Sequence, residues 1–136
     1  MLKLLSVFAA MLAFTFVMQF TTAKAADDAD DAGASQKVTG ILIDNACGSK
    51  MMEKDDPEAA AVKHTRACAM KKSCEESGYA VISGKELLKL DDNGNRLAKD
   101  FLAKSEKEDD LRVTVEGTVD GDKIAVTSLE AAPDKK

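Results

Sequence analysis

Every cysteine of this 136-residue chain, and its single histidine, lies between Cys47 and Cys74. The cysteines are Cys47, Cys68 and Cys74, and the histidine is His64. Thiols and imidazole bind metals, form disulfides or act as nucleophiles, and no other part of the chain carries them. Any metal, disulfide or nucleophilic chemistry of these side chains would therefore lie in this segment, which marks the candidate site.

The first 25 residues have the pattern of a signal peptide. Lys3 precedes an almost continuously apolar run from Leu4 to Phe20, and Ala23-Lys24-Ala25 gives a small-x-small cleavage pattern. A transmembrane anchor needs about 20 apolar residues, and this run is at the short edge of that length. We therefore expect cleavage before Ala26, export to the periplasm or secretion, and no membrane span after cleavage.

The mature chain is acidic and almost free of aromatic side chains. Cleavage removes Lys3 and Lys24 and no acidic residue, so the formal charge falls from −5 to −7. Phe101 and Tyr79 are the aromatic residues that remain. Nucleic-acid binding needs basic patches and stacking platforms, so this composition argues against it, and against binding to anionic membranes.

Hydrophobic patterning predicts one mainly β domain with five strands. Residues 26–36 are small and acidic and predict a disordered leader. The clearest strand alternates apolar and polar residues from Leu111 to Val119, with one buried and one solvated face, and Asp120-Gly121 is a hairpin turn signal. The five expected strands are residues 37–43, 79–82, 86–90, 111–119 and 123–129.

Two short helices are expected between the strands. Asp56 is a good N-cap before Pro57, and this helix should continue to about Cys68. It would place His64 and Cys68 one turn apart on one face. The second helix should run from Arg96 to about Lys104, capped by Asn95.

The order of these elements is that of an OB-fold. Five strands with a helix between the third and fourth predict a five-stranded OB-fold-like barrel over residues 37–130, followed by a flexible tail, 131–136. The alternative is an open five-stranded sheet with two helices. In the barrel, the Cys/His segment is an insertion between strands 1 and 2, a loop that often contributes to ligand binding.

Three segments resemble a family of small exported bacterial proteins known only as a domain of unknown function with an OB-like barrel. They are TGILIDNACG, KHTRACAMKKSCEESGYAV and LRVTVEGTVDGDKIAVTSL. The resemblance covers about Val38 to Leu129. It implies export and the barrel, and a family pattern comprising Asp44, Cys47, His64, Cys68, Cys74 and Gly78-Tyr79. It implies no established activity.

A metal centre is one interpretation of the Cys/His segment. Three thiolates and one imidazole from Cys47, His64, Cys68 and Cys74 form a recognised tetrahedral set for Zn²⁺. Met51, Met52 and Met70 add soft thioether donors, which suit Cu(I). The spacing matches no zinc finger, because no two cysteines form a Cys-x-x-Cys pair.

A disulfide is the second interpretation, since exported proteins meet an oxidising compartment. Any two of Cys47, Cys68 and Cys74 could pair, which would leave one thiol and make the chain a stapled structural or interaction domain with a protein or envelope partner.

Thiol redox or nucleophilic chemistry is a third interpretation, with His64 activating Cys68. The sequence reveals no third group to orient the histidine and no catalytic motif. The sequence therefore predicts a non-enzymatic binding module whose Cys/His/Met cluster holds zinc or copper, with the stapled domain as the alternative.

Overall fold

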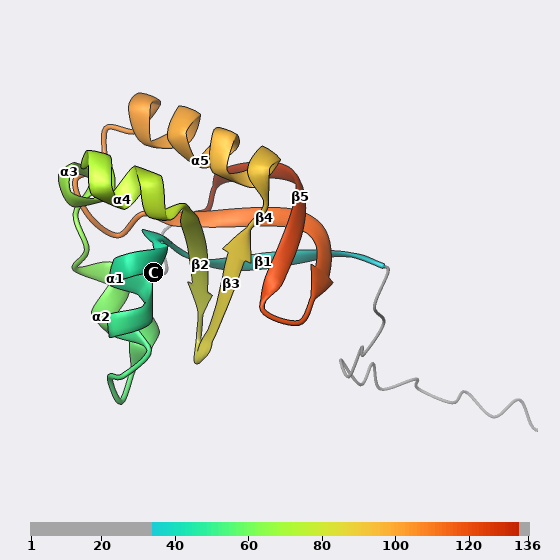
Figure 1. The fold of residues 1–136 in the computed structure, drawn as a ribbon, viewed down its shortest axis with the longest axis horizontal. Helices are drawn as coiled ribbons and strands as arrows, with labels where there is room; N and C mark the ends of the chain where they lie inside the picture. Colours follow the sequence, from blue (N-terminus) through green and yellow to red (C-terminus); the bar gives the residue numbers. More distant parts are fainter. Residues whose placement is uncertain (1–33, 134–136) are drawn as a thin grey trace, which may run out of the picture.

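The computed structural model describes residues 34–133. The predicted signal peptide and most of the predicted leader lie outside these residues. The described chain runs β1 (Ser35–Asp44), α1 (Asn45–Met51), α2 (Pro57–Val62), α3 (Arg66–Ala69), α4 (Lys72–Ser77), β2 (Tyr79–Ser83), β3 (Glu86–Leu90), α5 (Asp92–Lys104), β4 (Arg112–Asp120) and β5 (Lys123–Ala131) (Figure 1). Within residues 34–133, no helix has the length and apolar character needed to cross a bilayer.

The protein has a mixed helix and sheet fold built on one five-stranded sheet. Neighbouring strands follow the order β1-β2-β3-β5-β4, and β4 pairs again with β1. All pairs are antiparallel except a short parallel contact between β3 and β5. The ring closes because β1 is long enough for two partners: residues 35–41 pair with β4, and residues 41–44 pair with β2.

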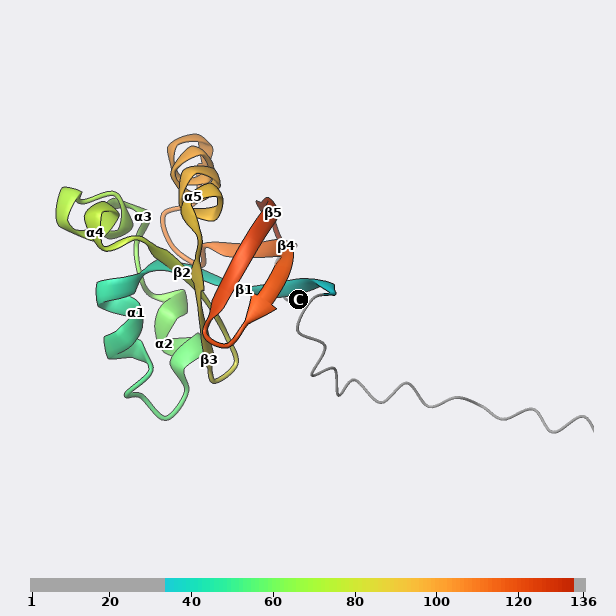
Figure 2. The same cartoon turned by 45° about the vertical axis from the view of Figure 1, so that its right-hand side comes forward.

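The helices divide into two groups around this sheet. Helix α5 lies over one end of the ring, whereas α1 to α4 form the insertion between β1 and β2 on the side of the molecule (Figures 1 and 2). The main core fills the ring under α5. A smaller apolar cluster lies between the sheet and the insertion, and consists of Ile41, Ile43, Ala61 and Ile82.

The five predicted strands and both predicted hairpins are confirmed, with shifted ends. β1 begins at Ser35, inside the segment predicted as disordered leader, because Ser35 pairs with Thr118. β5 continues to Ala131, which pairs with Val113. Ala131, the first residue of the predicted tail, is therefore part of β5.

The prediction of two helices is wrong, since the described residues contain five. The single helix expected from Asp56 to Cys68 is broken: α2 starts at Pro57 with Asp56 as its cap, as predicted, but ends at Val62. The break arises at Thr65, whose hydroxyl accepts a hydrogen bond from the Cys68 N–H and starts a new helix. This local side-chain cap competes with continuation of the first helix.

Two further helix predictions need correction. Helix α5 begins at Asp92, one turn earlier than expected, because the carboxylate of Asp91 accepts from Gly94 N–H and serves as the cap in place of Asn95. Helices α1 and α4, with seven and six residues, were not predicted, because they are too short to show an apolar period.

The prediction that one face of β4 is solvated is wrong at Arg112. Arg112 is 6% exposed, since its guanidinium donates to Glu58 of α2 at 2.7 Å and lies 3.5 Å from Asp110. Glu58 also accepts from Gly84 N–H in the turn between β2 and β3. The ion pair between Arg112 and Glu58 therefore holds α2 against the sheet.

Gly40 lies where β1 passes from one partner strand to the other, and we expect Gly40→Ala to destabilise the protein strongly. An added Cβ would overlap the backbone carbonyl of Ile82 and meet Val81 Cγ1 at 2.7 Å. The free energy of unfolding in urea should fall by at least about 3 kcal/mol.

Gly84→Ala is the matched control, because Gly84 has a positive φ of 58° but open space around the new Cβ. Only the conformational penalty applies there, so the loss should be about 1 kcal/mol. Equal losses for the two variants would show that close packing at Gly40 does not set the path of β1.

Candidate metal centre

The insertion brings the three cysteines together. The sulfur atoms of Cys47, Cys68 and Cys74 lie within 4.8 Å of one another, although they come from α1, α3 and α4. Cys74 is buried, while Cys47 and Cys68 are partly exposed. Zinc–sulfur bonds of about 2.3 Å in a tetrahedron place two sulfurs about 3.8 Å apart. A small inward movement would therefore let all three thiols reach one ion.

Each cysteine occupies the same position in its own short helix, three residues after the N-cap. The Cys47 N–H donates to the Asp44 carboxylate at 2.9 Å, and the Cys68 N–H donates to the Thr65 hydroxyl at 3.2 Å. In α4 the Cys74 N–H donates to the Lys71 carbonyl at 2.9 Å. The thiol cluster is thus built from the first turns of three helices that converge at one point.

Asp44 and His64 form a buried pair beside the thiols. The Asp44 side chain is fully buried and that of His64 is 5% exposed, and His64 Nε2 lies 3.1 Å from Asp44 Oδ2. The contact lacks hydrogen-bond geometry, so Asp44 Oδ2 and both ring nitrogens of His64 have no hydrogen-bond partner among the described residues. The expectation that no third group faces the histidine is wrong, because Asp44 does.

The predicted ligands form two overlapping groups. One contains the three thiols, and the other joins Asp44, Cys47 and His64, again within 4.8 Å. Among the described residues, no single group of this size unites His64 with all three sulfurs. His64 and Cys68 do not share a helix face, since His64 follows the end of α2 and Cys68 lies in α3. Cys47 is the residue common to both groups.

When no cation is present, the surroundings of Cys47 and Cys74 favour the protonated form of both thiols. Burial raises the pKa of Cys47 to about 11, and the charges of Asp44, Cys68 and Cys74 add to this effect. Burial, followed by the charge of Asp44, also raises the pKa of Cys74. The pKa of His64 is lowered by burial, which outweighs the opposing effect of Asp44. A bound cation would reverse this balance, because it stabilises thiolates and neutral imidazole.

The methionines are placed differently from the cysteines. Met51 and Met52 pack against the apolar cluster under α1 and α2, which Cys47 also contacts. Met70 is 39% exposed, and its sulfur lies 3.9 Å from Arg66 Nη1. The three thioethers are therefore not gathered in one place, unlike the thiols.

Hydrogen bonds tie the insertion to the sheet and join its first and last helices. The Tyr79 hydroxyl donates to the Ala69 carbonyl at 3.0 Å, which ties α3 to β2. The Asn45 amide donates to the Ser77 carbonyl at 2.8 Å, which ties the start of α1 to the end of α4. Gly78, with a φ of 78°, makes the turn into β2. The Gly78-Tyr79 pair in the family resemblance thus supports the site without belonging to it.

Sequence reasoning identified the three cysteines and His64, but it did not assign Asp44 a role from its own chemistry. From the sequence, Asp44 was noted only as a member of the family pattern and as the residue that ends the first strand. A usable signal was present, because Asp44-x-x-Cys47 has the spacing of an N-cap followed by the third residue of a helix.

Comparisons with known proteins give no relative of this chain: no family model, no curated protein and no solved structure matches it. The function must therefore be argued from the site alone, and the family resemblance stays a prediction.

We expect Cys47 to react slowly with iodoacetamide in the folded, reduced and metal-free protein. With its pKa raised to about 11 from 9.0, its thiolate fraction at pH 8 is lowered about 100-fold. The rate, followed by mass spectrometry of the Cys47 peptide, should keep rising with pH until near 11.

Unfolding in urea provides the control for this experiment, because it removes the burial and the neighbouring charges. The rate at pH 8 should then increase by about the same 100-fold factor. A rate in the folded protein that levels off near pH 9 would contradict the described environment of Cys47.

Proposed function

We propose that this protein is a binding module that holds a soft or borderline transition-metal ion on Cys47, Cys68 and Cys74. The convergence of three thiols within 4.8 Å, from three separate helices, is the observation that carries the proposal. The raised pKa values of Cys47 and Cys74 mean that both thiols are protonated without a cation, so metal binding would release their protons. The role is non-enzymatic.

Zinc fits this site better than copper(I). Cu(I) prefers thiolate and thioether donors, whereas Zn²⁺ also accepts imidazole and carboxylate. The groups next to the thiols are the carboxylate of Asp44 and the imidazole of His64. The exposed Met70, by contrast, contacts Arg66.

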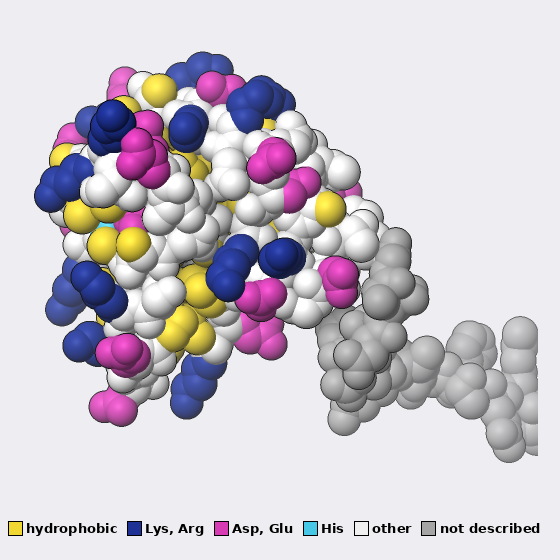
Figure 3. Space-filling view, viewed as in Figure 1, with side chains coloured by type: hydrophobic (Ala, Val, Ile, Leu, Met, Phe, Trp, Pro, Cys, Tyr) yellow, Lys and Arg dark blue, Asp and Glu magenta, His cyan; other side chains and the backbone are white. Residues whose placement is uncertain are grey.

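The proposal places the site on an OB-like barrel in an exported protein. The strand order β1-β2-β3-β5-β4, with α5 between β3 and β4, supports the OB-like class. The apolar run and cleavage pattern in residues 1–25 support export to the periplasm or secretion. Positive and negative side chains are mixed on the surface visible in Figure 3. This supports binding at a defined site and not attraction of a partner by a large charged surface.

The alternative is a domain stapled by one disulfide that binds a protein or envelope partner. The same proximity favours it, because sulfurs within 4.8 Å need little movement to form a bond. A disulfide would leave one thiol unpaired and would give the buried Asp44–His64 pair no role. Thiol nucleophilic chemistry with His64 activating Cys68 is disfavoured, since His64 groups with Asp44 and Cys47 and not with Cys68.

Zinc binding to the reduced, metal-free mature protein tests the proposal. In competition with a chromophoric chelator, the wild type should bind zinc, and Cys68→Ser or Cys74→Ser should weaken the affinity by at least about 100-fold, since each removes a thiolate ligand. Cobalt(II) should give the intense near-ultraviolet absorption of thiolate ligation.

Met70→Leu is the matched control, because it removes an exposed soft donor whose sulfur lies beside Arg66, and it should leave the affinity unchanged. Protein isolated without reductant should show three alkylatable thiols. A single alkylatable thiol, a mass lower by two hydrogens and no zinc affinity after reduction would reject the metal module in favour of the staple.

A further inference from the structure

The Asp44–His64 pair has a geometry that the trithiol site does not explain. Both side chains are buried, they come from the end of β1 and from the loop after α2, and their polar atoms face each other at 3.1 Å without a hydrogen bond. A buried polar group without a partner costs about 1–3 kcal/mol, so three such atoms at one point need an explanation.

A metal ion between these atoms would supply the missing partner. Zinc binds nitrogen and oxygen at about 2.0–2.2 Å, which in a tetrahedron puts the two ligand atoms about 3.4 Å apart. The observed separation of His64 Nε2 and Asp44 Oδ2, 3.1 Å, is close to this value. One carboxylate oxygen of Asp44, one ring nitrogen of His64 and the Cys47 sulfur lie within 4.8 Å of one another, which gives three ligands.

Resting on the proposed function, we propose that the site holds two divalent ions bridged by the Cys47 thiolate. One ion is bound by Cys47, Cys68 and Cys74, and the other by Asp44, Cys47 and His64. A thiolate sulfur has more than one lone pair and can bind two borderline-soft cations at once.

The charges of the ligands support two ions over one. Three thiolates and the Asp44 carboxylate carry four negative charges, and the neutral His64 adds none. Two divalent cations balance these charges, whereas one would leave two negative charges in a largely buried cluster, where uncompensated charge is costly.

Zinc titration of the reduced, metal-free protein, followed by native mass spectrometry, tests this proposal. The wild type should bind two zinc ions. Asp44→Asn and His64→Gln should each bind one, and so should Cys68→Ser, which spares the Asp44–His64 position. Cys47→Ser should weaken both ions, because serine cannot bridge them. Cadmium NMR of the wild type should show two resonances, and that of His64→Gln one.

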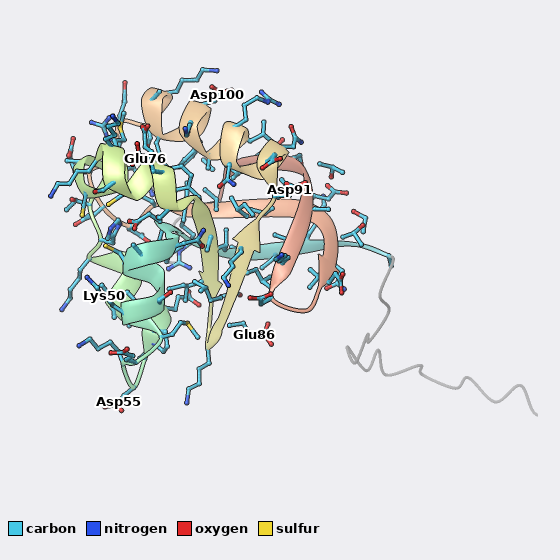
Figure 4. All side chains as sticks on the ribbon, in the orientation of Figure 1. Lys50, Asp55, Glu76, Glu86, Asp91 and Asp100 are labelled. Atoms are coloured by element: carbon cyan, nitrogen blue, oxygen red, sulfur yellow. The ribbon has the colours of Figure 1, made fainter. Side chains whose placement is uncertain are left out.

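Asp91→Asn is the matched control for Asp44→Asn. Both carboxylates cap a helix by accepting an N–H three residues ahead, and asparagine keeps an acceptor oxygen at each cap. Asp91 lies at the start of α5, away from Lys50 on α1 (Figure 4), so Asp91→Asn should still bind two ions. Circular dichroism of each variant identifies any that fails to fold, and His64→Gln then stands in for Asp44→Asn.

The outcomes separate the two proposals. Saturation of the wild type at one ion, or two ions in both Asp44→Asn and His64→Gln, overturns the bridged pair and leaves the trithiol module standing. Loss of all zinc in His64→Gln also overturns the bridged pair, because that result would mean that His64 and the thiols bind the same single ion. Absence of zinc from the wild type would reject the proposed function itself.

Discussion

The buried carboxylate of Asp44 is the group on which the insertion depends. One oxygen accepts the Cys47 N–H and starts α1, and the other faces His64. Because Asp44 is also the last residue of β1 and pairs with Tyr79, its position is fixed by the sheet. A fully buried carboxylate costs several kcal/mol unless it is compensated. The buried carboxylate of Asp44 therefore lies at the point where the sheet, the first helix of the insertion and His64 meet.

The insertion is held by tertiary contacts and not by its own helical stability. Its helices have four to seven residues, well below the length at which an isolated helix is stable in water. What fixes them is attachment to the sheet, through Glu58 to Arg112 and Tyr79 to Ala69. The Arg66 N–H also donates to the Glu108 carbonyl, in the connection between α5 and β4, at 2.7 Å. These contacts position the three thiols, so an ion bound there would require little further ordering of the chain.

The strands could be predicted because a period of two needs only a few residues to be visible, as in Leu111 to Val119. The cap at Asp56 before Pro57 was recognisable for the same reason: it is a local signal. The helices of the insertion were not, since four to seven residues give no apolar period, and Thr65 was not recognised as a cap. Missing that cap merged α2 with α3 and placed His64 on the wrong element. The partnership of Asp44 with His64 is a contact between residues 20 apart in the chain, and only the tertiary structure reveals it.

Three cysteines can form only one disulfide within the chain and leave one thiol over, whereas three thiolates can bind one metal ion together. A disulfide between any two cysteines leaves the third thiol unused, and it gives no role to the Asp44 carboxylate and the His64 imidazole beside the cluster. The proposed metal centre would use all five side chains, including the two that a disulfide does not use. The position of Cys47, shared between the thiols and the Asp44–His64 pair, is the geometric reason to treat them as one centre.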